Sequence, residues 1–119
     1  MGKQHKDPFP KQSQWRANQR LQLVHANICG PVTPEYNNGK KYLITFIDDL
    51  TRKTWMFFLT RKSEALTTFK HLKAQVEKEA DTGIVCLRTD MGGEFNSEKF
   101  HEFCRIHGIK RHLTFTYTP

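Results

Sequence analysis

The spacing of apolar residues changes at Ser63, and this change restricts the fold more than any other feature of the sequence. Before Ser63, two nearly continuous apolar runs at 42–47 and 54–59 predict strands that are close enough to pair as a hairpin. After it, apolar side chains recur three or four residues apart from 65 to 80, which places them on one face of a helix. A β-rich first half is therefore expected to precede a half in which helices alternate with strands.

Shorter apolar runs and residues typical of helix ends predict the remaining elements. They predict further strands at 21–28, 84–89 and 109–115, and helices at 63–83 and 97–107. An antiparallel opening is then followed by crossover connections, which favour parallel pairing, in the order β-β-β-α-β-α-β. We therefore predict an α/β domain with a five-stranded mixed sheet and helices on its faces.

The first residues of the chain differ in composition from the rest. Prolines and polar side chains are frequent there and no apolar period is visible, so residues 1–19 are expected to form an extended basic arm and residues 20–119 the folded domain. Trp15 or Phe9 is expected to dock on that domain. No apolar run approaches the length of about 18 residues that a membrane-spanning helix needs, so no membrane partner is expected.

Positive charge is in excess, since 19 Lys and Arg residues against 12 Asp and Glu residues give a formal net charge of +7. This excess favours polyanionic partners such as DNA. The adjacent basic pairs Arg61-Lys62 and Lys110-Arg111 are candidate nucleic-acid-binding residues, each able to make a salt-sensitive phosphate contact that reads no sequence. A solvated basic surface explains the same residues equally well.

The three cysteines, Cys29, Cys86 and Cys104, are widely separated and form no Cys-x-x-Cys pair. This pattern fits a reducing, intracellular location, cytoplasmic or nuclear, better than a disulfide framework or a zinc site. All three cysteines are expected to be small buried apolar residues.

Four sequence motifs carry a specific resemblance. They are LVHANICGP at 23–31, YLITFIDDLTR at 42–52, LRTDMGGEF at 87–95 and TYTP at 116–119. Together and in this order they resemble the integrase catalytic cores of Copia-type (Ty1/Copia) retrotransposons, particularly those of plants. The resemblance implies an RNase H-like fold in which residues 20–119 are a partial catalytic core, with the family's C-terminal helix missing.

The basic arm is also similar to a segment of that family. Its first residues, GKQH at 2–5, resemble the tail of the small zinc-binding segment that precedes these cores. The cysteine and histidine ligands of that segment would lie upstream, so no zinc is expected to bind to the chain.

The resemblance further implies a reaction, the processing of DNA ends and their joining to target DNA by two divalent metal ions, usually Mg²⁺. Three carboxylates hold these ions in the family. The first corresponds to Asn27, which is a neutral amide, and the second to Asp90, which is present. The third, a glutamate, would lie beyond Pro119. We therefore expect Asp90 to bind Mg²⁺ or Mn²⁺ only weakly, and the chain to be catalytically inactive.

Other polar residues near these positions are expected to have structural roles. Asp48 and Asp49 should close the hairpin turn, one of them pairing with an arginine of that turn. Glu94 should order the neighbouring glycine turn or the helix start. His25 shares a strand face with Asn27 and so could approach a metal site, although a hydrogen-bonded structural histidine is the more frequent case.

Three functions are compatible with these observations. The first is an integrase-derived core that binds DNA without joining it. The second is part of an active Mg²⁺-dependent integrase in which Asn27 is a natural or introduced inactivating change. The third is a domesticated protein-interaction module, because an apolar region at 113–117 that lacks the family's last helix could bind a partner or form a homodimer. Binding that weakens steeply with salt would distinguish DNA from such a protein partner.

Overall fold

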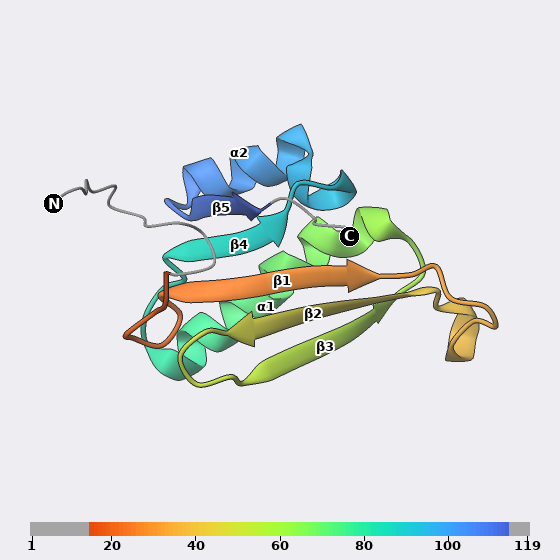
Figure 1. Cartoon of the computed structure of the whole chain (residues 1–119), viewed down its shortest axis with the longest axis horizontal. Coiled ribbons are helices and arrows are strands. Elements are labelled where there is room, and N and C mark those ends of the chain that lie inside the picture. The colour runs from red at the N-terminus through yellow and green to blue at the C-terminus, as the bar shows by residue number, and fades with distance from the viewer. Residues whose placement is uncertain (1–14, 115–119) are drawn as a thin grey trace, which may run out of the picture.

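The computed structural model describes residues 15–114, whose strands and helices are shown in Figure 1. The elements are β1 Leu23–Cys29, β2 Tyr42–Asp48, β3 Thr54–Leu59, α1 Ala65–Ala80, β4 Cys86–Asp90, α2 Glu98–Ile106 and β5 Lys110–Thr114. Short 3-10 turns, η2 Asn37–Gly39, η3 Lys62–Glu64 and η4 Gly93–Asn96, lie between them. The predicted order β-β-β-α-β-α-β is confirmed.

The five strands form one mixed sheet in the order β3-β2-β1-β4-β5. β2 pairs antiparallel with β1 and β3, whereas β4 pairs parallel with β1 and β5. β1, β3, β4 and β5 therefore point the same way, and their carboxyl ends lie toward the same edge of the sheet. The predicted five-stranded mixed sheet is confirmed.

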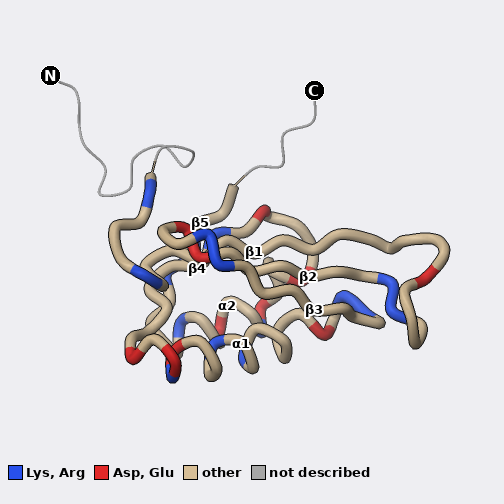
Figure 2. The backbone as a smooth tube through the Cα atoms, turned by 90° about the horizontal axis from the view of Figure 1, so that it is seen from below, with Lys and Arg blue, Asp and Glu red and all other residues tan. Residues whose placement is uncertain are grey.

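Both described helices cover the same face of this sheet (Figure 2). α1 connects β3 to β4, α2 connects β4 to β5, and both crossovers advance across the sheet in the same direction. Right-handed crossovers that advance in one direction place their helices on one side of a sheet. The expected helices on the faces of the sheet thus occupy one face within residues 15–114, and we call the other face the open face.

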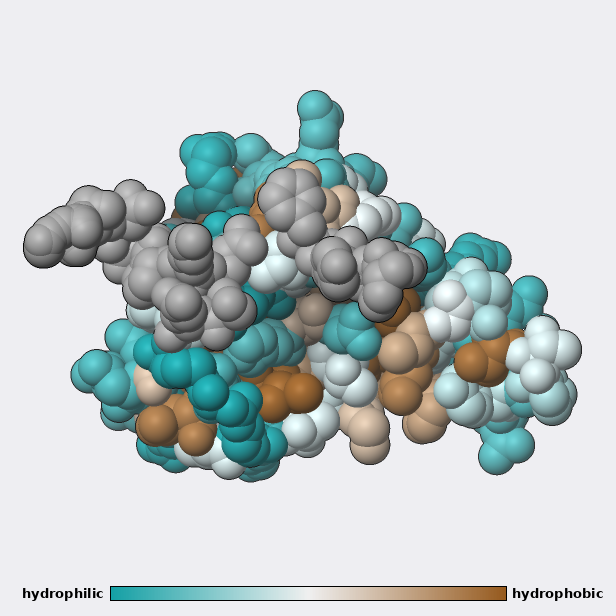
Figure 3. Space-filling model, in the orientation of Figure 1, coloured by the Kyte–Doolittle hydropathy of each residue, from teal (hydrophilic) through white to brown (hydrophobic). Residues whose placement is uncertain are grey.

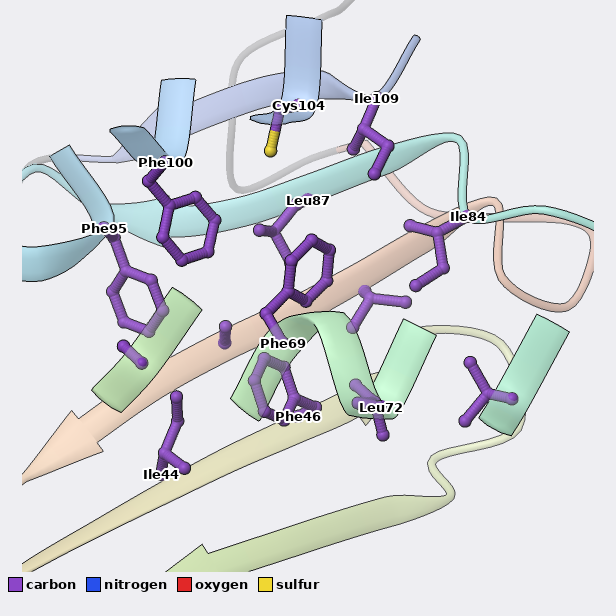
Figure 4. Packing of buried hydrophobic residues seen from close by; sticks show 14 of the residues in the cluster. Ile44, Phe46, Phe69, Leu72, Ile84, Leu87, Phe95, Phe100, Cys104 and Ile109 are labelled. Atoms are coloured by element: carbon purple, nitrogen blue, oxygen red, sulfur yellow. The ribbon is translucent and has the colours of Figure 1, made fainter. Parts of the chain in front are cut away.

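Aromatic side chains join the helices to the covered face of the sheet (Figure 4). Phe69 of α1 stacks on Phe46 of β2 at 5.9 Å and on Phe100 of α2 at 5.5 Å, measured between ring centroids. All three rings are fully buried. Val24 and Leu87 of the central strands belong to the same cluster. Phe69 is therefore the side chain at which both helices and the sheet meet.

The helix ends follow local signals. The Oγ of Ser97 accepts a hydrogen bond from the N–H of Phe100 at 3.1 Å and caps α2, and Gly108 follows that helix with a φ of +70°. The observed range Glu98–Ile106 agrees with the predicted helix at 97–107. α1 ends earlier than the predicted stop at Gly83, because Asp81 already adopts a left-handed conformation with a φ of +55°.

Two buried carboxylates at the end of β2 attach the segment that precedes β1. Asp49 accepts hydrogen bonds from the N–H of Ala17 at 2.7 Å and from Nε of Arg16 at 3.1 Å. Asp48 accepts one from the N–H of Leu21 at 2.7 Å. The acidic pair therefore holds residues 16–21 against the sheet.

The same two carboxylates close the turn between β2 and β3. Oδ2 of Asp48 accepts hydrogen bonds from the N–H and the Oγ1 of Thr51, at 2.9 and 2.8 Å. Asp49 forms an ion pair with Arg52 at 3.6 Å. The predicted turn-closing roles of Asp48 and Asp49 are confirmed.

Trp15 packs on a second, smaller cluster, which consists of Ala17, Leu23 and Cys86. Leu23 and Cys86 are directly paired positions on the open-face side of β1 and β4. The predicted docking of Trp15 is thus confirmed, whereas Phe9 lies outside the described residues.

The cysteines divide into two groups. All three are free thiols, and Cys86 and Cys104 are buried as predicted. Cys29 is exposed, so its predicted burial is wrong. The reason is its position, because Cys29 is the last residue of β1 and alternation directs it to the open face.

Replacing Phe69 with Ala should lower the free energy of unfolding by about 3–5 kcal/mol, because a cavity would remain between α1, α2 and the sheet. Gln75→Ala, at an exposed position of the same helix, is the matched control and should change it by less than about 0.5 kcal/mol. Urea denaturation followed by circular dichroism measures both. A loss below about 1 kcal/mol for Phe69→Ala would show that the aromatic stack does not hold the helices on the sheet.

Stability should also depend on the ionisation of Asp49. Burial opposes ionisation, but hydrogen bonds from Ala17, His25 and Arg16 outweigh it and lower the pKa of this carboxyl below its usual 3.8. Because the pKa is lower in the folded state, the ionised group stabilises the fold above about pH 4, and this contribution is lost as the pH falls through the lowered pKa. Asp49→Asn should therefore destabilise the protein by about 1–3 kcal/mol at pH 7.

The difference in unfolding free energy between Asp49→Asn and the unaltered protein should shrink as the pH falls from about 4 to about 2. Urea titrations of both proteins at several pH values measure it. A difference that stays constant over this range would contradict the assigned role of the Asp49 charge.

Candidate functional site

β1 and β4 bring the predicted site positions together. Their parallel register pairs Leu23 with Cys86, Val24 with Leu87 and His25 with Arg88. Continued by two residues, this register sets Asn27 beside Asp90, on strands that are about 4.8 Å apart. Side chains alternate along a strand, so Asn27 and Asp90 lie on the same face as His25 and Arg88. The ladder itself ends at His25–Arg88, and the continued register would make the two site positions neighbours on the open face, at the carboxyl ends of their strands.

The carboxylate of Asp90 already has a local partner. Its Oδ1 accepts a hydrogen bond from the N–H of Gly92 at 3.0 Å, so the half-buried side chain closes the turn that leads into η4. Gly93 follows with a φ of +40°, in the left-handed region that favours glycine. The carboxylate of Asp90 thus accepts the hydrogen bond that orders this turn, while Glu94 lies in the first turn of η4, at one of its two predicted places.

Asn27 places a neutral amide where the family resemblance implies a carboxylate. The side chain is exposed, and its Nδ2 donates a hydrogen bond to Sγ of Cys29 at 3.5 Å. An amide oxygen can ligate a cation but lacks the charge that offsets repulsion between two dications. Within residues 15–114, no three or more His, Cys, Asp or Glu side chains are arranged to hold a metal ion. The described residues therefore do not fit a two-metal centre.

His25, on the same face as Asn27, has a structural partner. Its Nε2 lies 2.7 Å from Oδ1 of Asp49, and that carboxylate is buried. Because the pKa of Asp49 is lowered, the carboxylate is ionised near neutral pH and accepts the hydrogen bond from the imidazole. The predicted structural role of His25 is confirmed.

Arg88 and His112 continue the row from His25 across the open face, and neither was singled out from the sequence. Nε of Arg88 donates to Nδ1 of His112 at 2.8 Å, and its Nη2 donates to the carbonyl oxygen of Trp15 at 3.3 Å. The guanidinium also lies 5.8 Å from the centre of the Trp15 ring. The alternation of side chains along a strand could have identified Arg88 as a neighbour of the site, because it lies two residues before Asp90 in β4 and so on the same face.

Burial affects the charge of this row. It lowers the pKa of the Arg88 guanidinium, against an opposing effect of Asp49, and the guanidinium remains cationic. Burial, together with the charges of Arg88 and His25, also lowers the pKa of His112 from its ordinary 6.5. Near neutral pH, His112 is therefore a neutral hydrogen-bonding partner of Arg88.

The basic residues predicted to contact nucleic acid lie at different edges of the sheet. Arg61 and Lys62 are exposed and follow β3, so they lie toward the same edge as Asp90. Lys110 is also exposed, but it begins β5 and lies toward the opposite edge. These three side chains all face solvent.

Arg111 is half-buried and directed toward the covered face, so it is less exposed than Arg61, Lys62 and Lys110. Position 111 pairs with the buried Leu87, on the covered side of the sheet. Its Nη2 donates to the carbonyl oxygen of Phe95 at 2.8 Å and to Oγ1 of Thr89 at 3.0 Å, and the guanidinium lies 5.1 Å from the centre of the Phe100 ring. Arg111 therefore connects β5 with the segment that follows Asp90.

Sequence comparisons agree with these structural features. The family model described as "Integrase core domain" matches residues 17–119. The Pol polyprotein of transposon TNT 1-94 from Nicotiana tabacum is 41% identical over 118 residues, which cover 99% of this chain and 9% of that polyprotein. The Pol polyprotein of transposon RE2 from Arabidopsis thaliana is 31% identical over 119 residues, or 100% of this chain and 8% of that protein. The chain thus spans under a tenth of these relatives.

Solved structures share the fold at low sequence identity. One chain of a simian T-cell lymphotropic virus intasome in complex with PP2A regulatory subunit B56 gamma is similar, with a TM-score of 0.73 and 20% identity over 99% of this chain and 40% of that chain. The HTLV-2 integrase catalytic core domain in complex with magnesium has a TM-score of 0.65 and 19% identity, over 83% of this chain and 63% of that chain. The predicted RNase H-like integrase-core fold is confirmed.

Proposed function

Because this chain belongs to the integrase core domain family, we propose that it acts as a DNA-binding core from a retrotransposon polyprotein that does not join DNA ends. The observation that carries this proposal is the neutral amide of Asn27 beside the single carboxylate of Asp90. We propose that this DNA binding takes place inside the cell, in the cytoplasm or the nucleus. None of the helices in residues 15–114 is long and apolar enough to cross a membrane.

The lack of joining activity follows from charge at the site. Two metal ions that stabilise the attacking and leaving oxygens need anionic oxygen ligands between them. Asn27 and Asp90 together supply one negative charge, where two carboxylates would supply two. Weak binding of a single Mg²⁺ or Mn²⁺ at Asp90 is the most that this pair supports.

DNA affinity follows from the cationic surface. The net charge of +7 attracts the phosphate backbone, and Arg61, Lys62 and Lys110 are exposed cations from which phosphate contacts can be made. Such contacts position DNA without reading its sequence. We therefore propose binding that is independent of sequence and sensitive to salt.

Affinity for a fluorescent DNA duplex should fall steeply with salt and should be the same in Mg²⁺ and in EDTA at matched ionic strength. The reason is that phosphate contacts by Lys and Arg release counterions, whereas the proposed binding needs no metal. Fluorescence anisotropy over a salt series measures it. An absence of binding even at low salt would contradict the proposal and would favour a protein-interaction module.

A second candidate is part of an otherwise active Mg²⁺-dependent integrase. In this case Asn27 is a natural or introduced change that inactivates the site. The register of β1 and β4, continued two residues beyond His25–Arg88, favours this candidate, because it would set a carboxylate at position 27 beside Asp90. Asn27→Asp should then strengthen Mn²⁺ binding at least tenfold, since two adjacent carboxylates replace one. Isothermal titration calorimetry with Mn²⁺ measures the change.

The control for this experiment is Asn96→Asp, which adds the same charge at an exposed position of η4. Equal Mn²⁺ affinities for the two variants would argue against a retained metal site. If Asn27→Asp binds Mn²⁺, joining activity can be tested in a chain extended by the segment that follows in an active relative.

A third candidate, a protein-interaction module, is supported by apolar residues on the open face. Met56 and Phe58 of β3 are 61% and 49% exposed, and alternation places both on this face. Figure 3 views the molecule from the side of the open face and shows hydrophobic residues in several separate areas of it. The sequence indicates residues 113–117 as the region that binds a partner. Of these, Leu113 is half-buried, and positions 115 and 117 lie outside the described residues. A second copy of the chain or another protein is the proposed partner of this surface.

A further inference from the structure

We propose that Arg88 binds a phosphodiester group of DNA on the open face, directly beside the positions of Asn27 and Asp90. This assignment rests on the proposed DNA-binding function and names a contact residue that charge counting along the sequence did not identify. The ligand is the sugar-phosphate backbone of DNA, and no base recognition is implied.

The strand register puts Arg88 at the centre of a row of nitrogen-bearing side chains. Arg88 pairs with His25 of β1 on one side and with His112 of β5 on the other. Paired residues on neighbouring strands are about 4.8 Å apart, and Asp90 lies two residues further along β4, at about 6.6 Å. A DNA strand that passes the Asn27–Asp90 pair on the open face therefore comes within reach of the Arg88 guanidinium.

The guanidinium of Arg88 is held in place before any ligand binds. Nε donates to His112, Nη2 donates to the carbonyl of Trp15, and the group lies over the indole ring of Trp15. The side chain is half-buried, so it keeps some contact with solvent. A planar cation fixed in this way loses little conformational entropy on binding a phosphate, and the N–H donors of Nη1 and Nη2 that these two bonds do not use suit phosphate oxygens.

The nearest carboxylates are already engaged. Asp49 is shared among Arg16, His25 and the N–H of Ala17, and Asp90 accepts the hydrogen bond from Gly92. Their negative charges are thus partly compensated without Arg88. The amide at position 27 removes a further negative charge that would repel a phosphate at this place. The same substitution that disfavours a two-metal centre therefore favours a metal-free phosphate contact.

A purely structural role for Arg88 would be to fasten Trp15 to the sheet. The salt dependence of DNA binding separates this role from the proposed one, because it counts phosphate contacts and not stability. We would compare Arg88→Gln, Arg88→Lys and Arg105→Gln by anisotropy with a fluorescent duplex in EDTA. Arg105 is exposed on α2, on the covered side of the sheet, so its replacement removes the same charge away from the open face.

Arg88→Gln should weaken DNA binding at least threefold at low salt and should reduce the slope of log K against log salt by about 0.9, the value for one phosphate contact. Arg88→Lys keeps the cation and should restore most of that slope. Arg105→Gln should leave the slope unchanged. Thermal melting of each variant verifies that the folded protein is compared.

Equal slopes for Arg88→Gln and Arg105→Gln would overturn the assignment of Arg88, while DNA binding by the unaltered protein would still support the proposed function. No binding by the unaltered protein would overturn both. If Arg88→Gln does not fold, the Nε–H resonances of arginines in the unaltered protein provide the test. Addition of a short DNA duplex should shift the Arg88 resonance and not that of the inward-facing Arg111, and an unmoved Arg88 signal would reject the proposal.

Discussion

The parallel pairing of β1 with β4 is the contact on which the rest of this structure depends. It joins an antiparallel half, β1 to β3, to a parallel half, β4 and β5, although the paired residues are more than sixty positions apart. The register also assigns every side chain of both strands to a face. Val24 and Leu87 face the helices, whereas His25 and Arg88 face the other way. A slip of one residue would exchange the two sets, so burial of the apolar set fixes the polar row as well.

The amide at position 27 bears differently on the fold and on the proposed metal chemistry. Asn27 is exposed at the end of a strand whose stability comes from Val24, Ala26 and their neighbours, so an amide there costs the fold little. Metal binding depends instead on charge, and Asn27 and Asp90 together supply one negative charge where two carboxylates would supply two. The proposed lack of joining activity is therefore compatible with an intact architecture and cationic surface.

The two arginines of the parallel half illustrate where prediction from sequence succeeds and fails. Lys110-Arg111 is an adjacent basic pair, yet strand alternation sends its members to opposite faces, and Arg111 becomes an interior link between Phe95, Thr89 and Phe100. Arg88 is a single basic residue between Leu87 and Thr89, so no charge cluster marks it in the sequence. In the fold it lies next to His25, His112 and Trp15. Charge clusters along a chain thus do not indicate which cations share one face of the folded sheet.

The sequence by itself determined the order of elements, the mixed sheet and the family, because these depend on local periodicity and on residue identity at motif positions. Only the tertiary structure decided that both described helices share one face, that Asp90 closes its own turn and that Arg88 stands in a row beside the site. These features arise from long-range strand register and crossover direction. They depend on which distant segments meet, and this is not encoded in the spacing of any one segment.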